Sequence, residues 1–125
     1  MPYLLKTEPD VYSIDDLERD RETLWDGVSN PQAVGYLARM PVGEMLVIYH
    51  TGGEKRAVGL ARCVAVNADN PKAPEVRIRF VRRLSTPRTL AEMKTMKLFA
   101  QSPLVRQGRL GVVPLTAAQY EWIVG

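Results

Sequence analysis

The sequence contains very few residues of the kinds that build disulfides or dedicated metal sites. Among its 125 residues there is one cysteine, Cys63, and one histidine, His50. A single cysteine excludes an internal disulfide framework, and one cysteine with one histidine cannot complete a dedicated zinc site. We therefore expect no metal, no cofactor and a reducing, cytoplasmic setting.

Long apolar runs are also missing. No stretch approaches the roughly 20 apolar residues that a helix needs to cross a bilayer. The first residues lead directly into a strand-like segment, without the basic region and apolar stretch of a secretory leader. We expect neither a membrane-spanning segment nor a signal peptide.

The common catalytic motifs are absent as well. The chain has no GxSxG nucleophile elbow, no phosphate-binding loop, no HExxH and no GxGxxG. Nothing in the motifs therefore argues directly for an enzyme. With 46% hydrophobic and 25% charged residues, the composition is that of a globular protein, and the length indicates a single domain over residues 1–125.

The charge is distributed unevenly along the chain. The formal net charge is only +3, but the first twenty residues are rich in acids and the second half is rich in arginines. A mildly basic protein with one positive face favours a polyanionic partner. The arginines that suggest such a face are Arg77, Arg79, Arg82, Arg83, Arg88, Arg106 and Arg109.

Hydrophobic patterning predicts a mixed α+β fold. Strands are expected over residues 2–6, 45–50, 57–68, 75–84 and 109–115, and the alternation of Val76, Ile78 and Phe80 with charged residues indicates one solvated face. The middle strands have hairpin-like spacing, which favours a mainly antiparallel, barrel-like sheet with helices at its ends.

Four helix starts carry clear capping signals. The Asn30-Pro31 pair places an acceptor at the N-cap and a proline at the first helical position, and the other starts resemble capping boxes. The segment between the first two helices, residues 24–33, reads as a corner with a turn at Gly27. The other capping pairs are Ser13 with Asp16, Thr89 with Glu92, and Thr116 with Gln119.

Polar residues gather where the predicted strands and helices end. If these ends converge, they form a concave site with aromatic walls and hydrogen-bonding groups, which suits a planar ligand such as a nucleobase. If they do not, each residue has a local role, such as Asn30 as a helix cap. The candidates are Lys6, Thr7, Glu8, Trp25, Asp26, Asn30, Tyr49, His50, Arg106, Gln107, Gly108 and Arg109.

Four segments, in order, resemble a known family. KTEPDVYSIDDLERD, WDGVSNPQA, VGEMLVIYHTG and LVRQGRLGVVPL look like the EVE domain of the PUA-like superfamily, whose eukaryotic form is the thymocyte nuclear protein 1 family. The resemblance implies a pseudo-barrel of strands flanked by helices. It also implies a non-catalytic module that binds DNA or RNA by accepting a flipped modified base, chiefly a modified cytosine, into an aromatic pocket.

Carried over position by position, the resemblance implies two sets of site residues. The base-binding set is Lys6, Thr7, Glu8, Trp25, Asp26, Gly27, Val28, Asn30, Tyr49 and His50. The set that would contact the nucleic-acid backbone is Arg106, Gln107 and Arg109, with Gly108 between them.

The chain departs from the family pattern at Leu4, Ser29, Pro31, Val34 and Gly111. The family usually has Trp in place of Leu4, Arg in place of Ser29, Tyr in place of Pro31, a polar or basic residue in place of Val34 and Ser in place of Gly111. We expect the change at Leu4 to remove one aromatic wall of the pocket, and the changes at Ser29 and Val34 to remove phosphate contacts. These departures bear on the ligand more than on the fold.

Two other functions stay open. A small nucleoside-acting enzyme or metabolite-binding protein would use the same pocket, with His50 and either Glu8 or Lys6 as acid and base. An interaction subunit would present Tyr120, Trp122 and Ile123 of the last helix to a partner, although packing on the sheet explains these residues more simply. A monomer is favoured.

Overall fold

The computed structural model describes residues 1–125. Six strands form one sheet in the order β2-β5-β4-β3-β1-β6. The strands are β1 (Tyr3–Thr7), β2 (Glu22–Trp25), β3 (Met45–His50), β4 (Arg56–Asn67), β5 (Glu75–Thr89) and β6 (Val112–Pro114). All pairings are antiparallel except that of β1 with β3, so the expected mainly antiparallel α+β sheet is confirmed.

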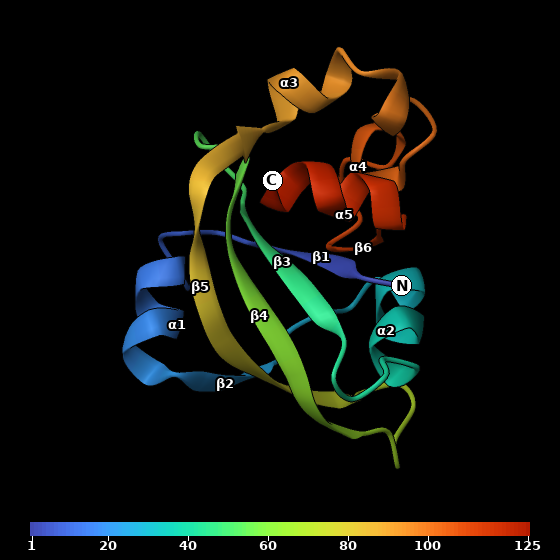
Figure 1. Ribbon diagram of the computed structural model, residues 1–125. Coiled ribbons are helices and arrows are strands. Elements are labelled where there is room, and N and C mark those ends of the chain that lie inside the picture. Colours follow the sequence, from blue (N-terminus) through green and yellow to red (C-terminus); the bar gives the residue numbers. More distant parts are fainter.

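The sheet is strongly curled. In Figure 1, β3, β4 and β5 run side by side across the front, while β1 and β2 cross behind them. The two edge strands are β2 and β6. Because β2 and β6 do not pair with each other, the barrel is not closed by hydrogen bonds.

Helices cover the sheet at its ends. They are α1 (Ile14–Asp20), α2 (Pro31–Ala38), α3 (Leu90–Lys94), the 3-10 turn η1 (Lys97–Phe99), α4 (Pro103–Arg106) and α5 (Ala117–Val124). Figure 1 shows α1 beside β5, α2 on the opposite flank, and α3, α4 and α5 gathered at one end. Their apolar faces enclose a single core of 28 buried residues.

The capping signals predicted the helix starts correctly. The side chains of Ser13, Thr89 and Thr116 each accept from the backbone N–H three residues on. The backbone N–H of each cap residue in turn donates to the side chain of that third residue, so all three form capping boxes. The Asn30 side chain accepts from the N–H groups of Gln32 and Ala33. These bonds satisfy donors that the first turn of a helix leaves free.

A close approach to Gly59 positions α1. A Cβ built on Gly59 would clash with the side chain of Ile14, so a larger residue there would force Ile14 to move. The absence of a side chain at this position lets Ile14 pack onto the sheet.

Three predicted boundaries were wrong. Leu24 and Trp25, predicted to belong to a corner over residues 24–33, instead end strand β2, which pairs with β5 in the register Glu22↔Arg79 to Trp25↔Val76. The strand expected over residues 75–84 continues to Thr89, and the strand expected over 109–115 is limited to Val112–Pro114. In each case the pairing partner, rather than the local pattern, sets the length of the strand.

Candidate functional site

A pocket of about 760 Å³ lies between the end of β1 and the strand β2. We call it the β1–β2 pocket. One side is formed by the end of β1 and the turn before α1, and the other by β2, the following turn and one arginine of β5. The residues that line it are Lys6, Thr7, Glu8, Val11, Tyr12, Glu22, Thr23, Leu24, Trp25, Asp26, Gly27, Val28 and Arg77.

The open edge of β2 faces this pocket. The backbone N–H of Phe80 donates to the carbonyl of Arg21 at 2.8 Å. Antiparallel pairs alternate between hydrogen-bonded and non-hydrogen-bonded positions. It follows from the register Leu24↔Arg77 that the backbone N–H and C=O of Leu24 point away from β5. Leu24 also lines the pocket, so its backbone offers one donor and one acceptor there.

The turn that carries Glu8 and Tyr12 is held by its own hydrogen bonds. The carbonyl of Glu8 accepts from the N–H groups of Val11 and Tyr12 at 3.0 and 2.9 Å, and the Thr7 hydroxyl donates to the carbonyl of Tyr12 at 2.7 Å. Val11 is 79% exposed at the pocket. The wall formed by this turn is therefore well defined, and it presents an apolar side chain to solvent.

Two aromatic rings form the back of the pocket. Tyr12 and Trp25 meet edge to face, with ring centroids 6.4 Å apart. Trp25 is only 7% exposed and belongs to the core, whereas Tyr12 is half-buried. Burial raises the pKa of the Tyr12 hydroxyl, which donates to the carboxylate of Asp20 at 3.0 Å. Tyr12 was not among the site residues predicted from the sequence.

The two cations at the pocket differ in whether they already form hydrogen bonds or ion pairs within the protein. The ammonium group of Lys6 donates to the carbonyl of Gly108 at 3.0 Å and lies 5.8 Å from the centroid of the Tyr49 ring. Burial lowers the pKa of Lys6. Arg77 forms no ion pair or side-chain hydrogen bond, and it is exposed. Arg77 is thus the cation at this site that is free to meet an anion.

Contacts within the protein engage several of the arginines that predicted a basic face, and acidic side chains pair with two of them. On β5, Arg79 pairs with Glu22 at 2.6 Å, and Arg83 pairs with Asp15 and Glu18 of α1. Arg88 stacks over Trp122, 4.8 Å from the ring centroid, and donates to the carbonyl of Gly125. The cations that line the pocket are therefore Lys6, which is bonded to the carbonyl of Gly108, and Arg77, which has no partner within the protein.

The predicted convergence is realised for seven residues of the base-binding set. These seven line the β1–β2 pocket, and the other three, Asn30, Tyr49 and His50, do not. The Asn30 amide oxygen is occupied as the cap of α2. Tyr49 is 2% exposed, and burial raises the pKa of its hydroxyl. The residues brought together are Lys6, Thr7, Glu8, Trp25, Asp26, Gly27 and Val28.

His50 is a satisfied interior residue. It is 5% exposed; its Nε2 accepts from the backbone N–H of Ile14 at 3.0 Å, and its Nδ1 lies 3.0 Å from the carboxylate of Glu54. Because Nε2 accepts, the hydrogen-bond network assigns the ring proton to Nδ1, which donates to Glu54. The acid–base pairing of His50 with Glu8 or Lys6 is therefore not assembled in this pocket.

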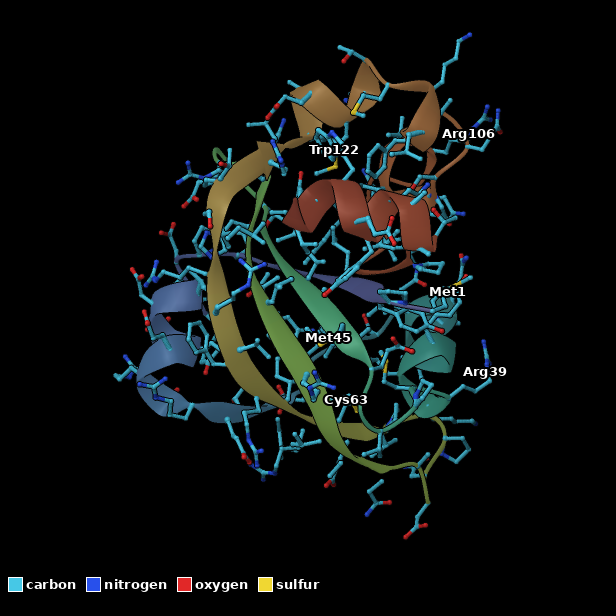
Figure 2. All side chains as sticks on the ribbon, viewed as in Figure 1. Met1, Arg39, Met45, Cys63, Arg106 and Trp122 are labelled. Carbon is cyan, nitrogen blue, oxygen red and sulfur yellow. The ribbon has the colours of Figure 1, made fainter.

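The second predicted set lies in the turn after α4. Arg106 donates from Nε to the carbonyl of Ala100 at 3.0 Å, and Figure 2 shows it at the edge of the molecule farthest from α1 and β2. Gly108 reaches the pocket through its bond to Lys6. Gln107 and Arg109 are exposed and do not line the pocket, so the structure does not bring this set into it.

The expectation about Leu4 was wrong. Leu4 is fully buried and pairs with Val47 of β3 and Val113 of β6, so it belongs to the core and does not face the pocket. Ser29 and Pro31 are exposed beside the cap of α2, and Val34 and Gly111 are half-buried. None of these positions lines the β1–β2 pocket.

The last helix has an internal role. Ile123 is 1% exposed, and Trp122 packs edge to face on Phe99 with centroids 5.6 Å apart. Figure 2 shows Trp122 near α3, at the end of the molecule where the C-terminal helices meet. Packing therefore accounts for the apolar residues of α5. No cluster of three or more potential metal ligands is present, and no helix is long and apolar enough to cross a membrane.

Comparison with known proteins places these features in a family. The EVE domain model matches residues 2–125. Human Thymocyte nuclear protein 1 is 27% identical over 161 aligned positions that cover 98% of this chain and 72% of the relative. A solved structure of a hypothetical protein from Leishmania major is 33% identical, has a TM-score of 0.87, and matches over 98% of this chain and 90% of that one.

One of the solved structures contains a ligand. The human THYN1 protein in complex with 5-methylcytosine-containing DNA is 28% identical to this chain, with a TM-score of 0.86 and coverage of 98% and 95% of the two chains. An ASCH protein from Zymomonas mobilis is 10% identical with a TM-score of 0.62, covering 98% of this chain and 94% of that one. The ASCH likeness concerns the fold alone. The PUA-like pseudo-barrel is thereby confirmed.

Proposed function

This chain belongs to the EVE domain family, and we propose that it is a non-catalytic module that binds nucleic acid by accepting one modified base, a modified cytosine, into the β1–β2 pocket. The observation that carries the proposal is the pocket itself, which lies at the open edge of β2 and contains seven of the residues implied by the family pattern. A volume of about 760 Å³ is ample for a nucleobase and part of its sugar.

The lining suits a flipped base. Tyr12 and the edge of Trp25 offer aromatic surface, and the Leu24 backbone offers hydrogen-bonding groups in the plane of the strand. Pockets for flipped bases combine these features, because the ring needs an apolar contact and its edge needs donors and acceptors. The human relative with 5-methylcytosine-containing DNA supports modified cytosine as the first ligand to test.

Arg77 is the residue that we assign to the phosphate backbone at the mouth of the pocket. It is exposed and has no acidic partner, so it can neutralise a phosphate without breaking an existing ion pair. Arg106, Gln107 and Arg109 stay proposed as more distant backbone contacts. RNA is a second possible carrier of the base.

The alternative of a nucleoside-acting enzyme receives no support from the position of His50, whose two ring nitrogens are both engaged away from the pocket. A general base must reach the proton that it removes. We further propose a monomer in the cytoplasm, and this location is supported by the single, buried and unpaired Cys63.

The proposal is tested by titrating labelled DNA duplexes that contain one 5-methylcytosine or one cytosine, at 50 and 200 mM salt, and following fluorescence anisotropy. We expect tighter binding to the methylated duplex and weaker binding at higher salt. Arg77→Gln should reduce the salt slope by about one unit for both duplexes, because one phosphate contact is lost.

Arg82→Gln is the matched control, since Arg82 is an exposed arginine of the same strand that does not line the pocket. It should leave the salt slope nearly unchanged. Equal affinity for methylated and unmethylated DNA, with no dependence on salt, would overturn the proposed function.

A further inference from the structure

Three carboxylates line the β1–β2 pocket, and only one of them lacks a partner within the protein. Glu22 is paired with Arg79 at 2.6 Å. Glu8 accepts from the hydroxyl of Thr51 at 3.3 Å. Asp26 has neither an ion pair nor a side-chain hydrogen bond, and it is exposed. Asp26 is therefore the acidic group at this site whose hydrogen-bonding capacity is left for a ligand.

Asp26 also lies next to the open edge of β2 in the pocket. It directly follows Trp25 at the end of β2, and the next residue, Gly27, has a positive φ of 74°. A glycine at this position makes the turn without strain. The free backbone N–H and C=O of Leu24 lie on the same open edge of β2. The pocket thus joins a backbone donor and acceptor to an unpaired carboxylate.

The chemistry of a carboxylate makes this arrangement selective. An ionised Asp accepts hydrogen bonds and donates none. The exocyclic amine of cytosine is a donor that Asp and Glu accept from. Thymine carries a carbonyl oxygen at the same ring position, and that oxygen would oppose the carboxylate with no proton between them. Because 5-methylcytosine and thymine share the ring and the methyl group, only the Watson–Crick edge distinguishes the two.

We propose that Asp26 is a specificity-determining residue that selects an amino-bearing pyrimidine over its keto counterpart. The inference rests on the proposed function and deepens it, because it assigns to one residue the edge of the base that is recognised. Discrimination of this kind is expected to be large, since the wrong base leaves an acceptor facing an acceptor in a partly desolvated site.

The test compares two DNA duplexes in which the probed base, 5-methylcytosine or thymine, lies opposite an abasic site, so that no base pair has to be broken in either. The readout is the ratio of the two dissociation constants at one salt concentration. We expect the unmodified protein to favour 5-methylcytosine by about tenfold or more, the value of one good hydrogen bond to a charged group. Asp26→Asn should bring the ratio close to one or reverse it, because the amide of Asn can donate to the thymine carbonyl.

Glu22→Gln is the matched control. It removes one negative charge from the same pocket, so it should raise the affinity for both duplexes alike and leave their ratio unchanged. Thermal unfolding confirms that each variant is folded. An Asp26→Asn protein that keeps the full preference for 5-methylcytosine would overturn this inference alone. A wild-type protein that binds neither duplex would instead overturn the proposed function on which the inference rests.

Discussion

The lining of the β1–β2 pocket and the end of β3, which pairs with the end of β1, both carry polar and aromatic residues but use them differently. At the end of β3, His50 has both ring nitrogens bonded within the protein, and Tyr49 is almost fully buried. At the pocket, Asp26, Arg77 and the backbone of Leu24 are left without partners. Groups that are already satisfied stabilise the fold, and groups that are not are available to a ligand.

Trp25 lines the pocket and is also part of the buried core, so its loss should have the largest effect. Trp25→Ala removes a ring that is 7% exposed and should lower the free energy of unfolding by about 3–5 kcal/mol. It should also abolish the preference for the modified base among the molecules that stay folded. Chemical denaturation and DNA titration measure the two effects separately.

Trp122→Ala serves as the control for that comparison, because Trp122 packs on Phe99 and Arg88 far from the pocket. It should reduce stability while leaving base preference intact. A Trp25→Ala protein with normal base preference would show that the ring acts only in the core.

His50→Phe tests whether the strand end has a purely structural role. The substitution keeps most of the volume but leaves the backbone N–H of Ile14 without an acceptor, which should lower the free energy of unfolding by about 1–3 kcal/mol. Affinity for modified DNA, corrected for the folded fraction, should not change. A specific loss of binding would show that His50 is one of the ligand-binding residues.

Asn30→Ala should have a smaller effect of the same kind. Its side chain accepts from Gln32 and Ala33 at the start of α2, and the loss of such a cap typically costs about 1 kcal/mol. Asn30→Asp, which retains the cap, is the matched variant and should unfold at nearly the original temperature. Reduced binding by both variants would contradict the assignment of Asn30 to capping alone.

Glu54 should give the smallest effect, visible as a dependence on pH. The hydrogen bond from His50 and the contact with Arg56 lower the pKa of the Glu54 carboxyl below its usual value. Its contribution to stability is therefore complete above the unfolded pKa and is lost as the pH falls through the folded pKa. Glu54→Gln should flatten the fall in melting temperature on acidification, while curves that fall equally for both proteins would show that the contact contributes nothing.

The helices could be predicted from the sequence because their signals are local. Ser13 with Asp16, Asn30 with Pro31, and Thr116 with Gln119 each fix a helix start through bonds within one turn. Strand β2 could not be predicted in this way. Glu22, Thr23 and Leu24 become a strand only because β5 pairs with them from more than fifty residues away.

The candidate site was predicted only in part, because some of its residues are marked by local signals and others are positioned by contacts distant in sequence. Lys6, Trp25 and Asp26 were found at the ends of predicted elements, and they meet at the pocket. Tyr12 was missed because its side chain reaches the pocket from a turn, held by hydrogen bonds to Glu8 and Thr7, that has no periodic pattern to show which way it faces. Leu4 was misplaced because the residue pattern of a short buried strand does not reveal which of its faces meets the core and which meets a ligand.

β1 is the first strand of the chain, yet it lies between β3 and β6, with Tyr3 opposite both Leu46 and Pro114. By contrast, β3, β4 and β5 follow one another as antiparallel neighbours. Contacts between residues far apart in sequence form slowly, because the entropy of closing a long loop is lost before the contact is gained. Refolding should therefore begin in the β3–β4–β5 meander, and β1 should join the sheet later, between β3 and β6. The end of β1 forms one wall of the pocket, so the recovery of ligand binding would report the last step of folding rather than the first.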